Sequence, residues 1–389
     1  MAFATRTSES TTYRQNRGPL RPDIVLVLTY LTLSAIGLLM IYSATAPGLL
    51  AAGDDPAQQL KEQAIFMVIG FIVFTVVSSI DLTEVRGFIG PIYVVVIGML
   101  VLVLTPVGDS QGIAQRWIDL GPIQFQPSEL AKIAVILMLA SILASSDVPL
   151  HWRTVARALV IVGVPSLLIF AQPDLGTMLV FAFVLLAMLF VGGSTIRQLG
   201  FLFVATAVGT VGVFKMDLIK EYQINRLTAF IDPGAHELSL SYNQVQSEIA
   251  IGSGGLLGKG LFEGTQTNLR FVPVQSSDFI FTAVGEQFGF VGSIIVIALF
   301  GVLLFRLLAI AGSARDRFGS LVATGIAAMF AFHVFVNIGM TIRIMPVTGL
   351  PLPFMSAGGT VFVAMSAALG LAHSVWMRRS VAPGDRRRG

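Results

Sequence analysis

Residues 24–44 read IVLVLTYLTLSAIGLLMIYSA, a run of 21 positions with no charged side chain. A helix of about 20 apolar residues crosses the hydrocarbon core of a bilayer, so this stretch predicts a transmembrane helix. A polar segment of more than 20 residues precedes the run, and no convincing small-residue cleavage site ends it. These features favour a retained helix over a cleaved signal peptide.

Similar apolar windows recur along the whole chain. They cover residues 64–80, 88–106, 129–145, 155–171, 175–193, 198–216, 279–305, 318–342 and 355–377. With 54% hydrophobic and 12% charged residues, the chain carries more apolar side chain than one soluble core could bury. The runs are nearly continuous and lack the alternation of barrel strands. They therefore predict an all-α polytopic membrane protein with about ten transmembrane helices.

The basic residues predict the orientation of these helices. If the N-terminus is cytoplasmic, most of the 25 Lys and Arg residues lie inside, which predicts N-in and C-in with an even number of spans. The chain then divides into a cytoplasmic tail at 1–22, a transmembrane domain at 23–378 and a basic cytoplasmic tail at 379–389. We expect the last tail to be disordered and to associate with the inner leaflet.

In this orientation the extended polar segments lie outside the membrane, so the functional site is expected there. They are residues 45–63, 107–128, 171–175, 217–278 and 343–354. The longest joins spans seven and eight. Its apolar patch at Ile249–Ile251 predicts that it folds against the helices rather than hanging free.

Composition removes several classes of function. The chain has no cysteine, which excludes disulfides, thiolate catalysis and cysteine metal ligands, and its four scattered histidines argue against a zinc site. The net charge of +3 is small and the basic residues lie mostly at segment ends, so nucleic-acid binding is not expected.

The first polar cluster joins the third loop to the fourth predicted span. Arg116 and Trp117 are followed by Gln126-Pro127-Ser128-Glu129, and Lys132 comes three residues after Glu129. That spacing places Glu129 and Lys132 on one helix face, where they can pair. Charged groups at a membrane edge are costly and mark candidate sites, although a structural ion pair beside an interfacial tryptophan is an equal alternative.

The second cluster is the turn Gln172-Pro173-Asp174-Leu175-Gly176-Thr177. Asp174 is placed to cap the following helix, and capping alone would explain it. The turn also faces the same side as the first cluster, so the two clusters could share an outer cavity.

Asp278 stands where the longest loop becomes a span, and Glu286 follows eight residues later. This separation is about two helical turns, so both carboxylates could share a face. Burial at a membrane edge raises the pKa of a carboxylate and suits it to act as a general base. Helix capping is the alternative.

Two glycine-rich segments complete the candidates. The first, Gly252-Ser253-Gly254-Gly255 with Gly258 and Gly260, lacks the spacing of the known nucleotide-binding motifs. It either makes tight turns or offers backbone amides to a pyrophosphate beside Lys259 and Arg270. The second, Thr348–Thr360, breaks the chain before the last span, and its prolines and glycines suggest a mainly structural role.

Taken together, these segments resemble the SEDS family (shape, elongation, division and sporulation), ten-span peptidoglycan polymerases of the bacterial cytoplasmic membrane. The resemblance covers nearly the whole chain. Its most specific parts are the Arg116-Trp117 and Gln126–Glu129 segments, Gln172–Thr177, Asp278-Phe279-Ile280-Phe281 with Glu286 and Gly289, and Gly349–Gly359.

Residues 246–266 look more like RodA, the elongation member, than FtsW, the division member. The sequence also departs from the family pattern. It has Ser276-Ser277 where a His-Thr pair often precedes the aspartate, Gln287 where a second glutamate often follows Glu286, and Ala357 in place of a common tyrosine. If that histidine takes part in proton transfer, Ser276 or a water must replace it.

The resemblance implies a glycosyltransferase that polymerises lipid II at the outer face, with Asp278 as the general base and undecaprenyl pyrophosphate as the leaving group. The resemblance also implies that the configuration at the anomeric carbon of the lipid-linked donor is inverted. Glu129, Asp174 and Glu286 would be supporting groups, and Glu129 with Asp174 could instead hold a divalent cation such as Mg²⁺ or Mn²⁺. The substrate-binding residues are expected to be Arg116, Trp117, Ser128, Lys132, Gln172, Lys259, Arg270, Ser276 and Ser356.

The alternatives are a lipid II flippase and a non-catalytic scaffold for cell-wall synthases. A flippase needs polar residues along a path through the bundle, whereas here the candidate groups gather outside. The family usually works with a class B penicillin-binding transpeptidase, so such a protein is the expected partner, alongside lipid II, undecaprenyl-pyrophosphate-linked glycan and membrane lipid.

Overall fold

The structure is a computed structural model that describes residues 21–106, 108–111, 114–119, 121, 124–215 and 242–379. The predicted tails at 1–22 and 379–389 therefore lie almost entirely outside the described residues, as does the first part of the 217–278 loop.

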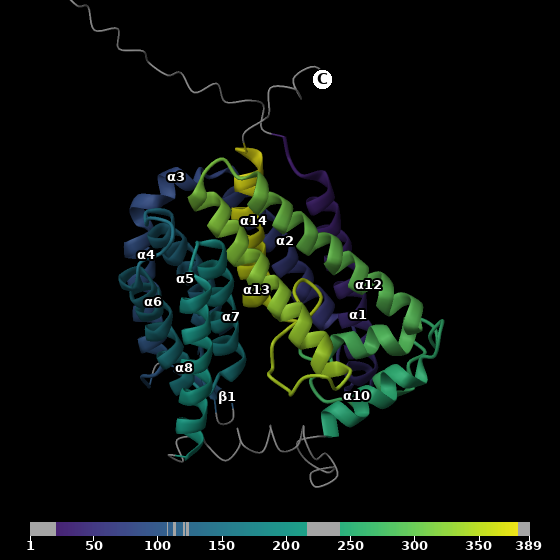
Figure 1. The fold of residues 1–389 in the computed structure, drawn as a ribbon. Helices are drawn as coiled ribbons and strands as arrows, with labels where there is room; N and C mark the ends of the chain where they lie inside the picture. The colour runs from purple at the N-terminus through teal and green to yellow at the C-terminus, as the bar shows by residue number, and fades with distance from the viewer. Residues whose placement is uncertain are drawn as a thin grey trace, which may run out of the picture.

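Each of the ten predicted spans corresponds to a helix (Figure 1). Eight described helical segments are long and apolar enough to cross a membrane, and Leu175–Val191 with Ile196–Val208 add two shorter ones. The all-helical membrane fold is confirmed. The helices are α1 (Ile24–Ala52), α2 (Gln58–Ser79), α4 (Ile89–Val103), α5 (Pro127–Ala144), α6 (Trp152–Ala171), α7 (Leu175–Val191), α8 (Ile196–Lys215), α12 (Ile280–Ser313), α13 (Arg317–Thr341) and α14 (Gly359–Met377). A short helix α3 (Leu82–Val85) and a 3₁₀ turn η1 (Arg86–Phe88) lead into α4.

Several boundaries differ from the predicted ones. Helix α1 continues past residue 44 through Pro47 to Ala52, where Gly53 at φ 80° ends it. The last span begins at Gly359 rather than 355, because the four residues before it belong to a non-helical segment.

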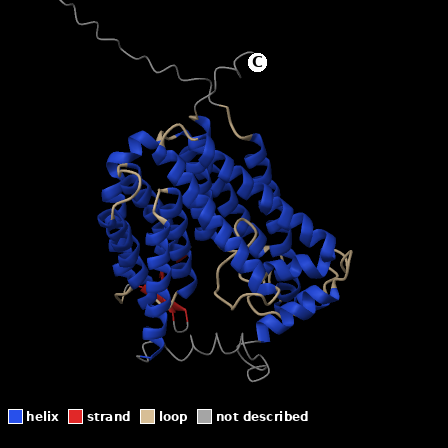
Figure 2. Cartoon of the chain, in the orientation of Figure 1, coloured by secondary structure: helices blue, strands red, loops and turns tan. Residues whose placement is uncertain are grey.

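Part of the 107–128 loop forms a small antiparallel sheet that the sequence did not indicate (Figure 2). Its strands are β1 (Gly108–Gln111), β2 (Ala114–Asp119) and β3 (Gln124–Phe125), paired in the order β1-β2-β3. With two to six residues each, they are too short to leave a clear alternating pattern.

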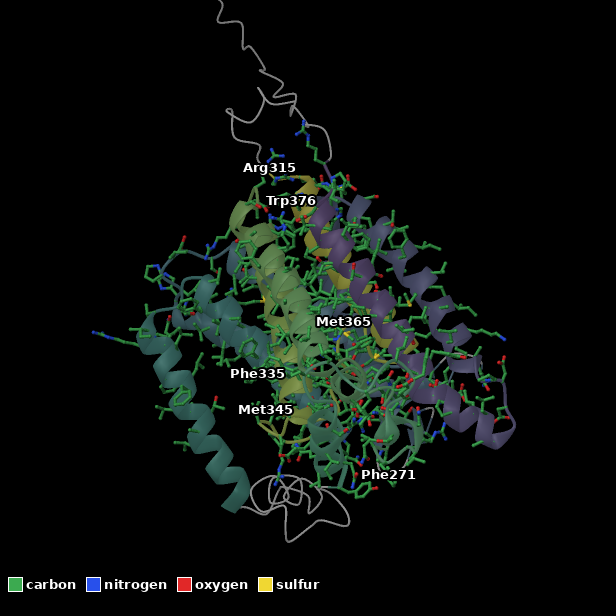
Figure 3. All side chains as sticks on the ribbon, turned by 90° about the vertical axis from the view of Figure 1, so that its right-hand side faces the viewer. Phe271, Arg315, Phe335, Met345, Met365 and Trp376 are labelled. Carbon is green, nitrogen blue, oxygen red and sulfur yellow. The ribbon has the colours of Figure 1, made fainter. Side chains whose placement is uncertain are left out.

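Both described ends of the chain lie at the same end of the helical bundle (Figure 1). Asp23, at the start of α1, pairs with Arg306 at 2.6 Å, and its backbone N–H donates to His373 Nε2 on α14 at 3.0 Å. Figure 3 places Arg315 and Trp376 at this end and Phe271 at the opposite one. This arrangement agrees with an even number of crossings. Which end faces the cytoplasm stays a prediction.

The described part of the long loop folds against the helices, as predicted. It contains α10 (Tyr242–Ser253) and α11 (Thr265–Asn268). Gln244 Nε2 donates to the Met345 carbonyl at 2.8 Å, and Ser247 Oγ donates to the Thr341 carbonyl at 2.8 Å. These bonds fix α10 to the end of α13.

Residues 342–358, between α13 and α14, turn back into the bundle (Figure 1). Leu350, Leu352 and Met355 are almost fully buried. A Cβ on Gly37 of α1 would lie 2.5 Å from Met355 Cα, so glycine allows the two backbones to meet. The returning segment is thus part of the core.

Candidate functional site

Asp278 lies half-buried immediately before α12. The N-cap position of α12 is Phe279, which makes no side-chain cap hydrogen bond, so Asp278 lies one residue before the cap position. The backbone N–H of Asp278 donates to the Val274 carbonyl at 3.1 Å, which closes the turn that carries it. The carboxylate therefore belongs to the turn that leads into α12.

Gly349, on the returning segment, lies beside this carboxylate. A Cβ at Gly349 would be 3.5 Å from Asp278 Oδ2. The glycine has φ +73°, a conformation that side chains disfavour. Residues 348–351 therefore form one wall next to Asp278, which gives this segment a place in the site beyond the mainly structural role expected from its sequence.

Glu129 and Lys132 form the predicted ion pair, with Oε1 and Nζ 2.8 Å apart. Their side chains are 4% and 1% exposed, which is rare for charged groups unless they are paired. Lys132 Nζ also lies 3.1 Å from His333 Nε2 on α13, and His333 Nδ1 lies 3.2 Å from the Pro351 carbonyl oxygen. The pair is thereby connected to the segment beside Asp278.

Arg116 and Asp174 form a second charged cluster, 4.0 Å apart. Arg116 donates to the carbonyls of Gln172, at 3.1 Å, and of Pro173. Asp174 caps α7 as predicted, accepting from the Thr177 N–H at 3.2 Å. Capping is therefore present at this turn, and Arg116 joins the first cluster to it, while a shared outer cavity stays a prediction.

Two further predicted residues lie at the edges of this cluster. The Gln172 side chain is buried and donates to the Leu100 carbonyl at 3.0 Å, which ties the turn to α4. Trp117 is half-buried on β2, next to Arg116.

The 348–351 segment also meets the start of α7. A Cβ at Gly176 would lie 2.8 Å from the Thr348 carbonyl oxygen. The Arg116–Asp174 cluster, the Glu129–Lys132 pair and Asp278 thus each lie close to the same four-residue segment. The structure brings Asp278 to the same segment as two charged groups that lie more than 100 residues before it in the sequence.

Ser276 and Ser356 join the Asp278 turn to the same returning segment. The Ala357 N–H donates to the Ser276 carbonyl at 2.8 Å, and Ser356 Oγ donates to the Ser277 carbonyl. The contacts of Ser276 thus run through its backbone. Both serines hold the turn that carries the carboxylate.

Glu286 and Lys259 occupy a different position from Asp278. Glu286 is fully buried and accepts from Lys259 Nζ at 2.9 Å and from the Thr267 N–H at 2.9 Å. Its carboxylate therefore fastens the 259–267 loop to α12, whereas Asp278 faces Gly349. The expectation that the two carboxylates share a face is wrong.

The glycine-rich loop packs against α12 instead of cradling an anion there. Gly258 has φ +82°, and a Cβ at this position would clash with the Gln287 carbonyl. The N–H groups of Lys259 and Gly260 donate to the carbonyls of Glu286 and Gln287, at 3.0 and 3.1 Å. These two amides are therefore already used.

Arg270 lies against α1, where its guanidinium packs over Gly48 and approaches the Thr45 carbonyl at 3.5 Å. This position is fixed by α1 rather than by the wall beside Asp278. A role for Arg270 or Lys259 in binding substrate stays a prediction.

Several buried polar atoms near the wall have no protein partner within the described part of the chain. They are Ser128 Oγ, Glu129 Oε2, Asn337 Oδ1 and Thr348 Oγ1. Buried polar groups normally form hydrogen bonds, so this concentration suits a polar ligand or ordered water. Ser128, a predicted substrate-binding residue, is one of them.

Metal binding by Glu129 and Asp174 has no additional support. Among the described residues there is no group of three His, Cys, Asp or Glu side chains that could hold a metal ion. Glu129 and Asp174 each lie beside a basic residue instead. A Mg²⁺ or Mn²⁺ site at these carboxylates stays a prediction.

Two polar residues of the site were not predicted. His333 and Asn337 are both completely buried on α13. Asn337 Nδ2 donates to the carbonyls of Asp278 and Leu350, each at 2.8 Å. Polar side chains four residues apart within the 318–342 window were the available signal, because polar groups inside a span are costly.

Comparisons with known proteins show the family of this chain. The family model of the FtsW/RodA/SpoVE cell cycle proteins matches residues 23–380. Peptidoglycan glycosyltransferase MrdB of Escherichia coli strain K12 is 38% identical over 343 residues, 88% of this chain and 92% of that protein.

Two solved structures are also similar. A chain in the structure of a peptidoglycan synthase complex has a TM-score of 0.78 at 29% identity, covering 95% of this chain and all of that one. The crystal structure of the rod shape determining protein RodA of Thermus thermophilus has a TM-score of 0.68 at 30% identity, covering 93% of this chain and 99% of that one.

The helical bundle and its acidic and basic site define a multi-pass membrane protein homologous to proteins of the bacterial inner membrane. The chain belongs to the FtsW/RodA/SpoVE family, the SEDS peptidoglycan glycosyltransferases.

Proposed function

We propose that this protein polymerises lipid II into glycan strands at the outer face of the cytoplasmic membrane, with Asp278 as the general base. The observation that carries the proposal is the half-buried Asp278 carboxylate facing a wall that is linked through His333 to the Glu129–Lys132 pair and that also meets the Asp174 turn. A base beside cationic groups is what transfer from a pyrophosphate-linked sugar requires.

In the proposed reaction, Asp278 accepts the proton of the attacking sugar hydroxyl. The hydroxyl oxygen forms a bond to the anomeric carbon of the lipid-linked donor, and the bond from that carbon to the pyrophosphate oxygen breaks. Attack from the opposite face inverts the configuration. The leaving undecaprenyl pyrophosphate gains negative charge, which Lys132 and Arg116 would stabilise in a poorly solvated site.

The remaining predicted residues have secondary roles in this scheme. Glu129 and Asp174 keep Lys132 and Arg116 in place, consistent with their 2.8 and 4.0 Å separations. Ser128 and Gln172 line the approach to substrate, and Trp117 offers a face for a sugar or a lipid chain. Ser276, Ser356 and Glu286 support the turn and loop that hold Asp278.

A role in cell elongation is proposed from the resemblance of residues 246–266 to RodA and from the similarity to a rod shape determining protein. The partner is proposed to be a class B penicillin-binding transpeptidase. A similar chain belongs to a complex that coordinates polymerization and crosslinking, which supports such an assembly.

The test is glycan synthesis from lipid II by the purified protein in lipid, with and without the transpeptidase. Asp278→Asn is expected to lower the rate by about 10²–10⁴-fold, the usual contribution of a general base, and to leave the protein folded. Asp54→Asn, which changes an exposed carboxylate between α1 and α2, is the matched control and should retain the wild-type rate. Full activity of Asp278→Asn would remove this residue from the mechanism.

A further inference from the structure

Helix α13 carries two fully buried polar residues of the candidate site, His333 and Asn337, four positions apart. This spacing places both side chains on the same helix face. Their partners belong to the Asp278 turn, the returning segment and α5, which are the three elements around the candidate site. No step of the proposed reaction uses either residue.

Asn337 connects the two sides of the site through one nitrogen atom. Its Nδ2 donates to the Asp278 carbonyl and to the Leu350 carbonyl, each at 2.8 Å. A primary amide has two N–H donors, and both are used here. The first bond fixes the backbone that carries the base. The second bond fixes Leu350, the residue after Gly349. Gly349 is the residue that lies beside the Asp278 carboxylate.

His333 extends the same connection to Lys132. A lysine ammonium group can donate hydrogen bonds and cannot accept them, so His333 Nε2 must accept from Lys132 Nζ, 3.1 Å away. In neutral histidine the proton then lies on Nδ1, which donates to the Pro351 carbonyl 3.2 Å away. His333 is therefore held as one tautomer between the cation and the wall.

We propose that His333 and Asn337 form a positioning clamp, which fixes the Asp278 carboxylate relative to the 348–351 wall and to Lys132. The proposal rests on the proposed function, since it assigns these residues to the alignment of base and cation for glycosyl transfer. Neither residue is a catalytic residue. Both act through the groups that they hold, so their loss should slow the chemical step more than it weakens substrate binding.

Variants of similar size separate the individual bonds of the clamp. Asn337→Leu keeps the volume and removes both donors. His333→Asn places an amide donor near the position of Nδ1 and keeps the bond to Pro351, whereas His333→Gln places its amide near the position of Nε2 and keeps the bond to Lys132. Thr324→Val is the control, because Thr324 is also a buried polar residue of α13 but bonds within its own helix, to the Ser320 carbonyl at 2.8 Å.

The experiment measures initial rates of glycan synthesis against lipid II concentration, together with thermal unfolding of each purified variant. For Asn337→Leu and His333→Gln, kcat should fall by about 10–10²-fold with KM within about threefold, because small misplacements of reacting groups have effects of this size. His333→Asn should recover most of kcat, and Thr324→Val should match the wild type.

Three results would overturn the clamp. The first is an unchanged kcat in Asn337→Leu, and the second is a variant in which only KM changes. The third is an equal loss of kcat in His333→Asn and His333→Gln that parallels the fall in their unfolding temperatures. The Asp278→Asn variant, measured in parallel, separates this outcome from failure of the proposed function. An inactive Asp278→Asn with a fully active Asn337→Leu rejects the clamp alone. An active Asp278→Asn rejects the assignment of the base.

Discussion

At the residue scale, Gly349 is constrained both by its backbone and by its neighbour. Replacing it with alanine would place a side chain at φ +73°, which costs about 1–2 kcal/mol. The new methyl would lie about 3.5 Å from Asp278 Oδ2, an ordinary contact that covers the carboxylate without a clash. We expect modest destabilisation and a larger loss of activity.

This expectation is checked by thermal unfolding and polymerisation rates. Gly98→Ala, on α4 where a Cβ meets no atom within 4 Å, should keep the wild-type rate and should not lower stability, because alanine favours a helix more than glycine does. A Gly349→Ala protein with reduced stability and full activity would show that the wall does not face the reacting groups.

The Glu129–Lys132 pair offers a second test at this scale. Lys132→Met leaves the Glu129 carboxylate buried without its cation, which should destabilise the protein by about 3–5 kcal/mol. The double variant Glu129→Leu/Lys132→Met removes both charges and should recover part of that loss while remaining inactive. The exposed pair Asp55–Lys61 is the comparison, and Lys61→Met should change stability little. Unfolding in detergent measures all three.

The site could be predicted from the sequence only where neighbours along the chain define it. Spacing alone gave the Glu129–Lys132 pair and the Asp174 cap, and both are present. The returning segment could not be placed beside Asp278, because its position depends on contacts with α1, α7 and α13 that no local pattern records. His333 and Asn337 were missed for the same reason, since their partners lie on other elements.

At the scale of elements, the docking of the glycine-rich loop on α12 depends on backbones that touch. Gly258→Ala would introduce a clash with Gln287 and a disfavoured φ of +82°, so the 252–264 region should detach from α12. Hydrogen exchange should then rise at Lys259 and Gly260, whose N–H groups bond to α12. Gly252→Ala has open space around its Cβ and should leave exchange unchanged. Equal exchange in both variants would contradict this account.

The helices themselves could be predicted because a long apolar run is a local property of the sequence. Their ends could not. The helical start expected at 355 is replaced by residues packed against Gly37, and the sheet of β1, β2 and β3 rests on pairings between very short strands. Tertiary contacts decide such boundaries, so sequence reasoning located the spans and missed the structures between them.

At the scale of the whole molecule, the distribution of basic residues predicts which side of the membrane each end faces. The structure adds that Arg315 and Trp376 share one end of the bundle and that Phe271 lies at the other (Figure 3). The chain has no cysteine, so single cysteines report position without background labelling. Asp54 and Arg315 are both exposed, one between α1 and α2 and the other between α12 and α13.

In spheroplasts, a membrane-impermeant maleimide should label Asp54→Cys, and Arg315→Cys should react only after the membrane is permeabilised. The physical reason is that arginine-rich ends are retained in the cytoplasm, which places the Asp278 site outside, where glycan strands are made. The opposite labelling pattern would put Asp278 on the cytoplasmic side. Asp278 could then not act on lipid II at the outer face, so this one measurement decides whether the proposed chemistry has access to its substrate.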